Sequence, residues 1–219
     1  MDITSYLLGK NSSGGGGGAD EYIRTTLNSN TSSSNTASNQ LLKKIPNFEC
    51  SSSVTSLNMA FSYSTLISVG NISGTSQVTN AGGMFFHCFS LESVGSIDTS
   101  NVTNFADMFN ECRIIKAIPQ LNTSKATYLG GMFKYCYQLE TIPVLNFASV
   151  TSAGSFANMY MGCDVLSDET LNNIMASCIT ATNYTGTKTL GELGLTNTQR
   201  QKCTTLSNYQ DFINAGWSL

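Results

Sequence analysis

Charged residues are scarce in this chain of 219 residues: they make up 11% of it, whereas about 25% is usual for a globular protein. The net charge is −3, so there is no excess of basic residues with which to bind a phosphate backbone, and we expect no nucleic-acid partner. A surface with so few charges must consist mainly of Ser, Thr, Asn and Gly. Such a surface suits an extracellular protein or a virus particle better than a cytosolic enzyme.

Groups that hold metals or catalyse reactions are also sparse. His87 is the one histidine and no Cys-x-x-Cys pair occurs, so the ligand spacings of a zinc site are absent. The glycine run 14–18 is not followed by Gly-Lys-Ser/Thr, as a phosphate-binding loop requires. The acidic residues fall at different repeat positions and form no evident catalytic pair. We therefore expect no cofactor, no metal and no enzymatic activity.

Long apolar runs are absent as well. No run approaches the ~18 residues that a membrane-spanning helix needs, and we expect no membrane span. The first ten residues lack the basic start and the small-residue cleavage site of a secretory signal. This absence argues against a secreted cell-surface protein.

The chain is rich in one repeated phrase, which begins with an apolar residue and Thr and runs through Met-Phe to Cys. Five copies follow one another, and the clearest three, at 78–88, 102–112 and 126–136, lie 24 residues apart. A second phrase follows each copy, as in the Leu-x-x-Ile-Pro-x-Leu of residues 139–145. A fixed period of this length is the signature of a solenoid. Stacking then buries apolar faces that no single coil can bury alone.

Each period is expected to contain one helix and one short strand. In the copy that begins at Val102, apolar residues lie at i, i+3, i+6, i+7 and i+10, which is the spacing of one helix face. Residues 98–100 and 122–124 precede two of these helices and offer side-chain oxygens as N-caps. The second phrase predicts a parallel strand of only a few residues, because its proline cannot donate to a ladder.

The seven cysteines are an odd number, so no closed set of disulfides uses them all. Cys88, Cys112 and Cys136 occupy one position of the repeat. This favours a column of small buried apolar side chains. Disulfides between coils, or a metal, are the alternatives.

The fifth copy departs from the period, since Cys163 lies 27 residues after Cys136. Either Ser155-Phe156 or Met159-Tyr160 then replaces the Met-Phe pair. Terminal repeats are expected to be atypical because they cap the stack.

Residues 167–219 predict a helical C-terminal cap. Ser167 is followed by two acids and can cap a first helix. Thr196-x-x-Gln199 and Ser207-x-x-Gln210 have the pattern of capping boxes, which open two more helices. Trp217, the single tryptophan, is expected in the core of this cap.

The run from Val102 to Ile118 resembles the BspA-like leucine-rich repeats of bacterial surface proteins, which carry Val-Thr-x-Met-x-x-Met-Phe-x-x-Cys-x-x-Leu-x-x-Ile. The resemblance covers about residues 41–166. It implies an α/β fold, a leucine-rich-repeat-like right-handed solenoid of about five coils with a helical C-terminal cap. It says nearly nothing about activity, because such repeats are scaffolds for surfaces.

The opening Met-Asp-Ile-Thr-Ser-Tyr-Leu-Leu-Gly-Lys, followed by a glycine run, resembles the start of tail-associated proteins encoded by phages and prophages of Gram-positive gut bacteria. This resemblance implies a virion protein whose residues 1–10 attach to other virion proteins. Residues 11–40 would be a linker, 41–166 the solenoid and 167–219 the cap. A bacterial cell-surface adhesin is the alternative function, and a cell-wall glycan hydrolase is a remote one.

The expected partner is a host surface protein or glycan, and a homo-oligomer is compatible with this design. Its candidate binding surface is a polar strip of mixed charge, formed where positions of the second phrase vary and stack from coil to coil. The alternative is that these are only solvated side chains. The polar strip consists of Lys43, Lys44, Asn47, Ser68, Asn71, Glu92, Ser93, Ser96, Lys116, Gln120, Glu140 and Thr141.

Overall fold

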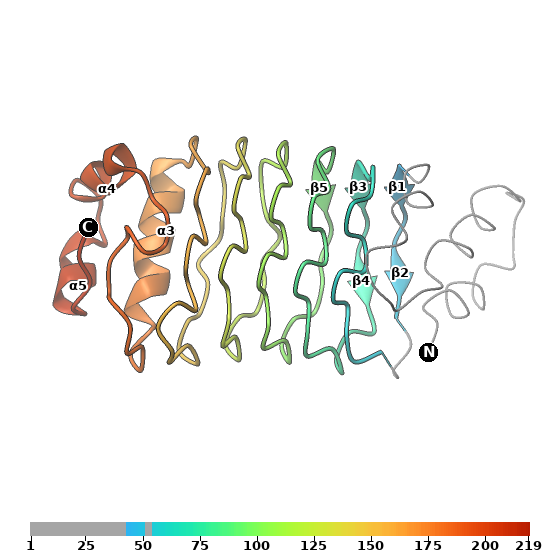
Figure 1. Cartoon of the computed structure of the whole chain (residues 1–219), viewed down its shortest axis with the longest axis horizontal. Coiled ribbons are helices and arrows are strands. Elements are labelled where there is room, and N and C mark those ends of the chain that lie inside the picture. The colour runs from blue at the N-terminus through green and yellow to red at the C-terminus, as the bar shows by residue number, and fades with distance from the viewer. Residues whose placement is uncertain (1–42, 51–53) are drawn as a thin grey trace, which may run out of the picture.

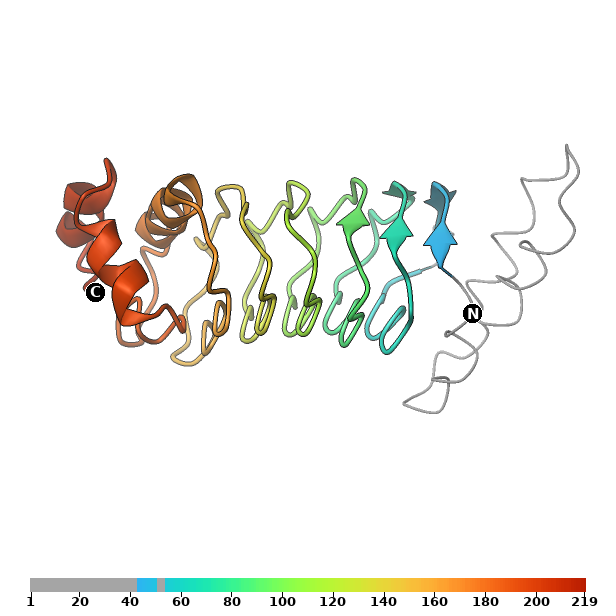
Figure 2. The same ribbon diagram turned by 90° about the horizontal axis from the view of Figure 1, so that it is seen from above.

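The structure, a computed structural model, describes residues 43–50 and 54–219. The repeats lie side by side as successive coils, with β1 near one end of the row and α5 at the other (Figure 1). The view from above shows the same row, with α3, α4 and α5 together at the C-terminal end (Figure 2). The attachment segment and the linker predicted over residues 1–40 lie outside the described residues.

Short parallel strands of two residues each run along the coils. The three-stranded sheet has the order β1 (Lys44–Ile45), β3 (Ser68–Val69) and β5 (Ser93–Val94). The second sheet pairs β2 (Phe48–Glu49) with β4 (Ile72–Ser73). Ala117 and Thr141 form an isolated parallel bridge in the next two coils. These pairings agree with the short parallel strands that the sequence predicts.

The segment 102–112 forms a series of tight turns. The prediction of a helix from its apolar spacing is therefore wrong, here and in the other coils between residues 54 and 166. Its N–H groups alternate between two kinds of partner. Phe109 N–H donates to the carbonyl of Met132 in the next coil at 2.9 Å, whereas Asn110 N–H donates back to Asp107 at 3.0 Å. A helix would need each N–H to bond within its own segment. Six of the ten backbone hydrogen bonds donated by residues 102–112 join neighbouring coils instead.

Two backbone positions in each coil have a positive φ, and they lie four residues apart. Met59 and these positions from Gly83 to Gly162 are each the third residue of a turn closed by an i to i+3 hydrogen bond, where a type II turn requires that φ. Glycine occupies three of them, as Gly83, Gly131 and Gly162. The larger residues there are Met59, Tyr63, His87, Asp107, Glu111, Tyr135 and Asn158. Turns repeated every four residues direct side chains to one side much as a helix does, which explains the wrong prediction.

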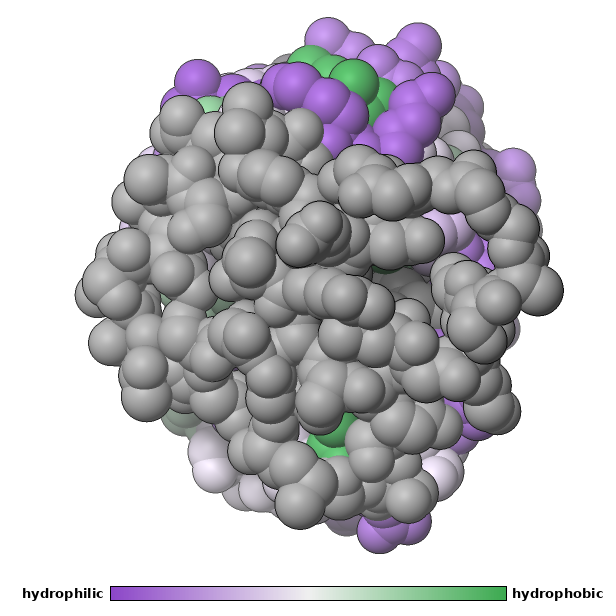
Figure 3. All heavy atoms as spheres, turned by 90° about the vertical axis from the view of Figure 1, so that its right-hand side faces the viewer, coloured by the Kyte–Doolittle hydropathy of each residue, from purple (hydrophilic) through white to green (hydrophobic). Residues whose placement is uncertain are grey.

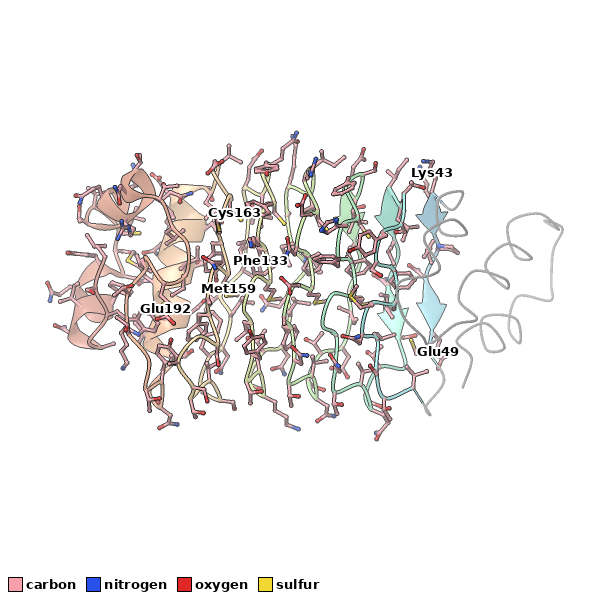
Figure 4. The ribbon with its side chains drawn as sticks, in the orientation of Figure 1. Lys43, Glu49, Phe133, Met159, Cys163 and Glu192 are labelled. Atoms are coloured by element: carbon pink, nitrogen blue, oxygen red, sulfur yellow. The ribbon has the colours of Figure 1, made fainter. Side chains whose placement is uncertain are left out.

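A column of stacked aromatic rings runs through the interior. Its members are Phe61, Phe85, Phe109, Phe133 and Tyr160, all of them buried. Neighbouring ring centroids lie 5.5, 5.3, 6.0 and 5.8 Å apart, with nearly parallel planes, a stabilising arrangement for aromatic pairs. Tyr160 therefore takes the phenylalanine position, so Met159-Tyr160 is the Met-Phe pair of the fifth copy. Figure 4 shows Phe133 and Met159 within the stack.

The residues expected to cap helices close turns and join coils instead. Asp98 accepts a hydrogen bond from the N–H of Ser100 at 2.9 Å, as Asp commonly does in turns. The buried hydroxyl of Thr99 accepts from Asn122 N–H at 2.8 Å and donates to the Asn122 carbonyl at 3.0 Å. Thr123 repeats this arrangement one coil later. These side chains satisfy backbone groups where the chain turns a corner.

Gly95 fits closely against an asparagine of the preceding coil. Asn71 Oδ1 accepts a hydrogen bond from Ser96 N–H at 2.9 Å, and a Cβ on Gly95 would lie 2.5 Å from that oxygen. Gly70 has the same relation to Asn47. The repeat therefore carries glycine at the position that lies against the asparagine of the preceding coil.

Helix α3 (Asp168–Ile179) covers residues 142–147, which form the last coil on the side of the short strands. It begins at Ser167, whose side chain accepts from Thr170 N–H, as the sequence predicts. Hydroxyl groups on and just after α3 accept hydrogen bonds from N–H groups that would otherwise be left at the open edge of the stack. The pairs are Thr170 with Ile142 at 3.1 Å, Ser177 with Leu145 at 2.9 Å and Thr180 with Phe147 at 2.6 Å.

Residues 185–195 extend the other side of the stack by part of a further coil, which the sequence did not predict. Thr185 N–H donates to the Thr151 carbonyl at 3.0 Å, and Tyr160 N–H donates to the Leu193 carbonyl at 2.8 Å. The ladder thus continues although the 24-residue period has ended. The expectation that 167–219 is purely a helical cap is incomplete in this respect.

Two short helices complete the C-terminal end. Helix α4 (Asn197–Cys203) begins with the predicted capping box of Thr196 and Gln199. Helix α5 (Tyr209–Asn214) has Asn208 at its N-cap with no side-chain cap hydrogen bond, so the second predicted box is wrong. The Ser207 hydroxyl is directed to Asn172 instead. Trp217 is buried as expected and stacks on Tyr184 with the ring centroids 5.9 Å apart.

We propose that this stack is a right-handed solenoid of the leucine-rich-repeat-like class, with tight turns in place of the expected helix in each coil. Parallel pairing in one continuous register, a shared core and coils in a single row support the proposal.

Replacing Phe109 by alanine should destabilise the protein strongly, because its ring packs between Phe85 and Phe133. Truncating a packed phenylalanine costs ~3–5 kcal/mol. Lys134→Ala is the control and should cost under ~1 kcal/mol, since Lys134 lies outside the ring column. Denaturant midpoints measure both, and equal small effects would mean that the register of the column is misread.

Gly95→Ala should also destabilise the protein, by ~1–3 kcal/mol, because the added methyl overpacks a tight contact. Gly191→Ala is the matched control, since its Cβ would meet the flexible end of Arg200 at 3.2 Å and Thr189 Oγ1 at an ordinary contact distance of 3.5 Å. Thermal melting of the two variants tests this. A Gly95 variant as stable as the Gly191 variant would show that the asparagine contact is loose.

Candidate functional site: two exposed faces of the stack

The structure brings the predicted polar strip together on the strand side of the coils. Lys44, Ser68 and Ser93 are paired in register, and the N–H groups of Glu140 and Thr141 both donate to the Lys116 carbonyl, at 2.9 and 3.0 Å. Ser68 is half-buried, and the other members are exposed. Figure 4 shows Lys43 at one end of the first coil and Glu49 at the other.

Three members of the polar strip are already engaged by backbone groups. Asn47 and Asn71 accept from N–H groups one coil later, at 2.7 and 2.9 Å. Gln120 Nε2 donates to the carbonyls of Leu121 and Val144, both at 3.2 Å. These three side chains hold coils together, so a ligand would have to compete with structural bonds. The lysines, glutamates and serines of the strip remain the better candidates.

A second face, which the sequence did not predict as a site, carries aromatic rings, three of them exposed and three half-buried. We call it the aromatic band, and it consists of Tyr63, Phe86, His87, Phe89, Tyr135 and Tyr137. Backbone hydrogen bonds align its coils: Tyr63 N–H donates to the Phe86 carbonyl at 2.7 Å, and His87 N–H donates to the Asn110 carbonyl at 2.8 Å. The band therefore lies along the stack, on the side of the tight turns.

The rings of the band are in contact with one another. His87 lies among three rings, with centroid distances of 4.9 Å to Tyr63, 4.0 Å to Phe86 and 5.3 Å to Phe89. Tyr135 and Tyr137 form a second group at 6.0 Å. Tyr63 is 38% exposed, and Phe89 and Tyr137 are each 43% exposed. The band thus offers two groups of ring faces to a partner.

An ion pair lies between the two ring groups. Arg113 contacts the Glu111 carboxylate through Nη2 at 2.6 Å and Nε at 2.8 Å. The same guanidinium lies over the Phe89 ring, 4.4 Å from its centroid, a cation–π contact. Lys134 Nζ lies 5.0 Å from the centroid of Tyr135. Charged groups are therefore interleaved with aromatic rings along the band.

The sequence contained a signal for this band. Tyr63, His87, Glu111 and Tyr135 lie 24 residues apart, as do Phe89, Arg113 and Tyr137. Aligning these positions would have shown two columns rich in aromatic and charged residues. They were missed because the expected helix directed attention to its buried face. His87, the one histidine of the chain, lies at the centre of a ring group.

The cysteine column is buried inside the stack, as expected for small apolar side chains. Cys88, Cys112, Cys136 and Cys163 each donate a hydrogen bond through Sγ to a phenylalanine carbonyl of the preceding coil, at 3.0 to 3.2 Å. All seven cysteines are free. Burial raises the pKa of Cys88 to about 11 and that of Cys163 to about 12. These thiols are therefore poor nucleophiles.

The carboxylates beside the band are engaged. Asp107 accepts from the Asn110 side chain at 2.7 Å, and Glu111 is bound to Arg113. Within residues 43–50 and 54–219, no cluster of three His, Cys, Asp or Glu side chains has a geometry that could hold a metal ion. In the same ranges, every helix is too short or too polar to span a membrane.

Comparison with known proteins provides a family. Residues 28–142 and 55–174 match the family described as "Mycoplasma protein of unknown function, DUF285", and together they span more than half of the chain. The chain belongs to the DUF285 family. This supports a repeat protein related to the BspA-like surface proteins, and it provides no link to a phage. No curated protein and no solved structure matches this DUF285 protein.

The thiols of this DUF285 protein should resist alkylation at about pH 8 while the chain is folded, and all seven should react once it is unfolded in guanidinium. Mass spectrometry after iodoacetamide treatment measures both states. Rapid labelling of the column in the folded chain would contradict its burial.

Stability should also fall in mild alkali. The thiol pKa of Cys88 rises from 9.0 to about 11 on folding, so above pH 9 the unfolded chain loses protons that the folded chain keeps. The free energy of unfolding should therefore decrease between pH 9 and 11. Cys88→Ala should flatten part of that decrease, and an unchanged slope would contradict the assignment.

Proposed function

We propose that this protein is a non-enzymatic binding protein that presents an extended repeat surface for recognition of a host protein or glycan. The observation that carries the proposal is the aromatic band. Exposed rings gathered in one place are costly to leave in water, and such patches commonly mark interaction sites. Aromatic residues and Arg are also the residues most enriched among energetically dominant interface contacts.

The architecture supports a role in display. A row of stacked coils buries its core between neighbours and leaves both faces available, which is how solenoids form extended binding surfaces. Figure 3 views the molecule from the N-terminal end, where the visible described residues at the rim are mostly hydrophilic, with small hydrophobic patches.

For its location, we propose a phage virion, in which residues 1–10 attach to the tail and the stack faces the host. The resemblance of the opening residues to tail-associated proteins supports this. A bacterial cell-surface adhesin is the second candidate, and the DUF285 match favours it through the surface repeat proteins to which that family is related. The genes adjacent to the coding sequence would separate the two.

Binding of the labelled full chain to Gram-positive gut bacteria and to their isolated cell walls tests the proposal. We expect saturable binding that is weakened about tenfold when Tyr63 and Tyr137 are both replaced by alanine, as for loss of dominant contacts. Saturable binding to neither preparation would contradict the proposed function.

A second variant separates the two faces. Replacing Glu92, Lys116 and Glu140 together by glutamine alters the polar strip and leaves the aromatic band intact. Melting curves should be unchanged, because these are exposed side chains. If this variant loses binding and the band variant does not, recognition belongs to the polar strip.

A further inference from the structure

We propose that the aromatic band is a carbohydrate-binding site that takes an unbranched glycan of pyranose rings, laid along the stack. This inference rests on the proposed function and specifies its ligand. It follows from the faces of the rings, the ion pair between them and the spacing of the coils.

The ring faces fit a sugar. One face of many pyranose rings presents C–H groups, and an aromatic face is electron-rich at its centre, so the two stack. Tyr63, Phe89 and Tyr137 are each about two-fifths exposed, which leaves part of each ring free while the rest is held by packing. The tyrosine hydroxyls can also donate and accept hydrogen bonds at the edge of a sugar.

The ion pair favours a glycan over an apolar protein surface. Glu111 and Arg113 lie between the two ring groups, and the Arg113 side chain is 47% exposed and the Glu111 side chain 16% exposed. A dry protein interface would remove water from this pair, and that desolvation can exceed the attraction between the charges. Sugar hydroxyls both donate and accept, so they can replace the lost water on the carboxylate and the guanidinium at the same time.

The spacing requires an oligosaccharide. His87 lies in one coil, Glu111 in the next and Tyr135 in the one after, joined by backbone hydrogen bonds of 2.8 Å from His87 to Asn110 and from Glu111 to Lys134. Two steps of a parallel ladder amount to about 10 Å. A single sugar can cover one ring group, whereas a longer chain can contact both groups and the ion pair between them.

The rings are also positioned before any ligand arrives. Each coil of the band is fixed to the next by the backbone ladder, and Arg113 is held by both Glu111 and the Phe89 ring. Little side-chain freedom is then lost on binding, which favours affinity at modest contact area. The charges of Asp107, Glu111, Arg113 and Lys134 cancel, so a neutral glycan meets no net charge on the band.

Isothermal titration calorimetry of the full chain with chitohexaose, cellohexaose and hyaluronan hexasaccharide, together with a printed array of bacterial and mammalian glycans, tests the inference. We expect binding to at least one unbranched glycan, with the hexasaccharide binding more tightly than its disaccharide. Binding to none of the probes and to no arrayed glycan overturns the proposal. If the chain still binds cells or cell walls in that case, the proposed function survives without the glycan site.

Matched variants locate the site. Phe89→Leu keeps apolar bulk and removes the ring, and Tyr137→Ala removes the second group; each should weaken glycan binding about fivefold, the scale of one aromatic stacking contact. Tyr128→Ala is the control, since Tyr128 is 47% exposed and lies outside the band. Glu111→Gln leaves every ring in place and should weaken binding as well. Unchanged affinity in Phe89→Leu and Tyr137→Ala, with intact melting curves, overturns the placement on the band.

Discussion

The backbone hydrogen bonds between coils are the constraint on which the rest of this structure depends. In the turn segment, every second N–H donates to the next coil, as Phe85 does to Met108 at 2.8 Å and Phe109 to Met132 at 2.9 Å. These bonds fix the register between coils, so any side chain meets its counterpart from the next period. The stacked phenylalanines, the buried thiols and the exposed rings are three consequences of one register.

The buried half of the fold follows from the sequence because burial depends mainly on the period. The stacking of Phe109 between Phe85 and Phe133 required only that equivalent positions meet. The local backbone conformation, in contrast, did not follow from the sequence. Tandem turns and a helix place apolar residues at similar intervals, and the residues that hold a positive φ, such as Met59 and Asp107, are not the glycines that signal a turn.

The exposed half was harder to predict, for a physical reason. Core positions are all apolar, so their repetition can be recognised in the sequence alone. Surface positions share no such chemistry. Their role depends on which side chains of the neighbouring coils the register places beside them. The polar strip was found because its positions flank an obvious apolar phrase. The aromatic band was missed because Phe86 and His87 adjoin Phe85 in the sequence, although both are half-buried at the surface whereas Phe85 lies in the core.

Backbone strain supports a role for the band beyond stability. Tyr63, His87 and Tyr135 have φ values of 57°, 59° and 60°, and bulky residues rarely adopt this region. Glycine would be relaxed there, and this fold uses it at the equivalent position of the last coil, Gly162, with φ of 79°. Sparsely populated backbone conformations cost ~1–3 kcal/mol each and cluster at functional sites. Under the proposed function, the strain at Tyr63, His87 and Tyr135 is the energetic consequence of placing these rings where a ligand can contact them.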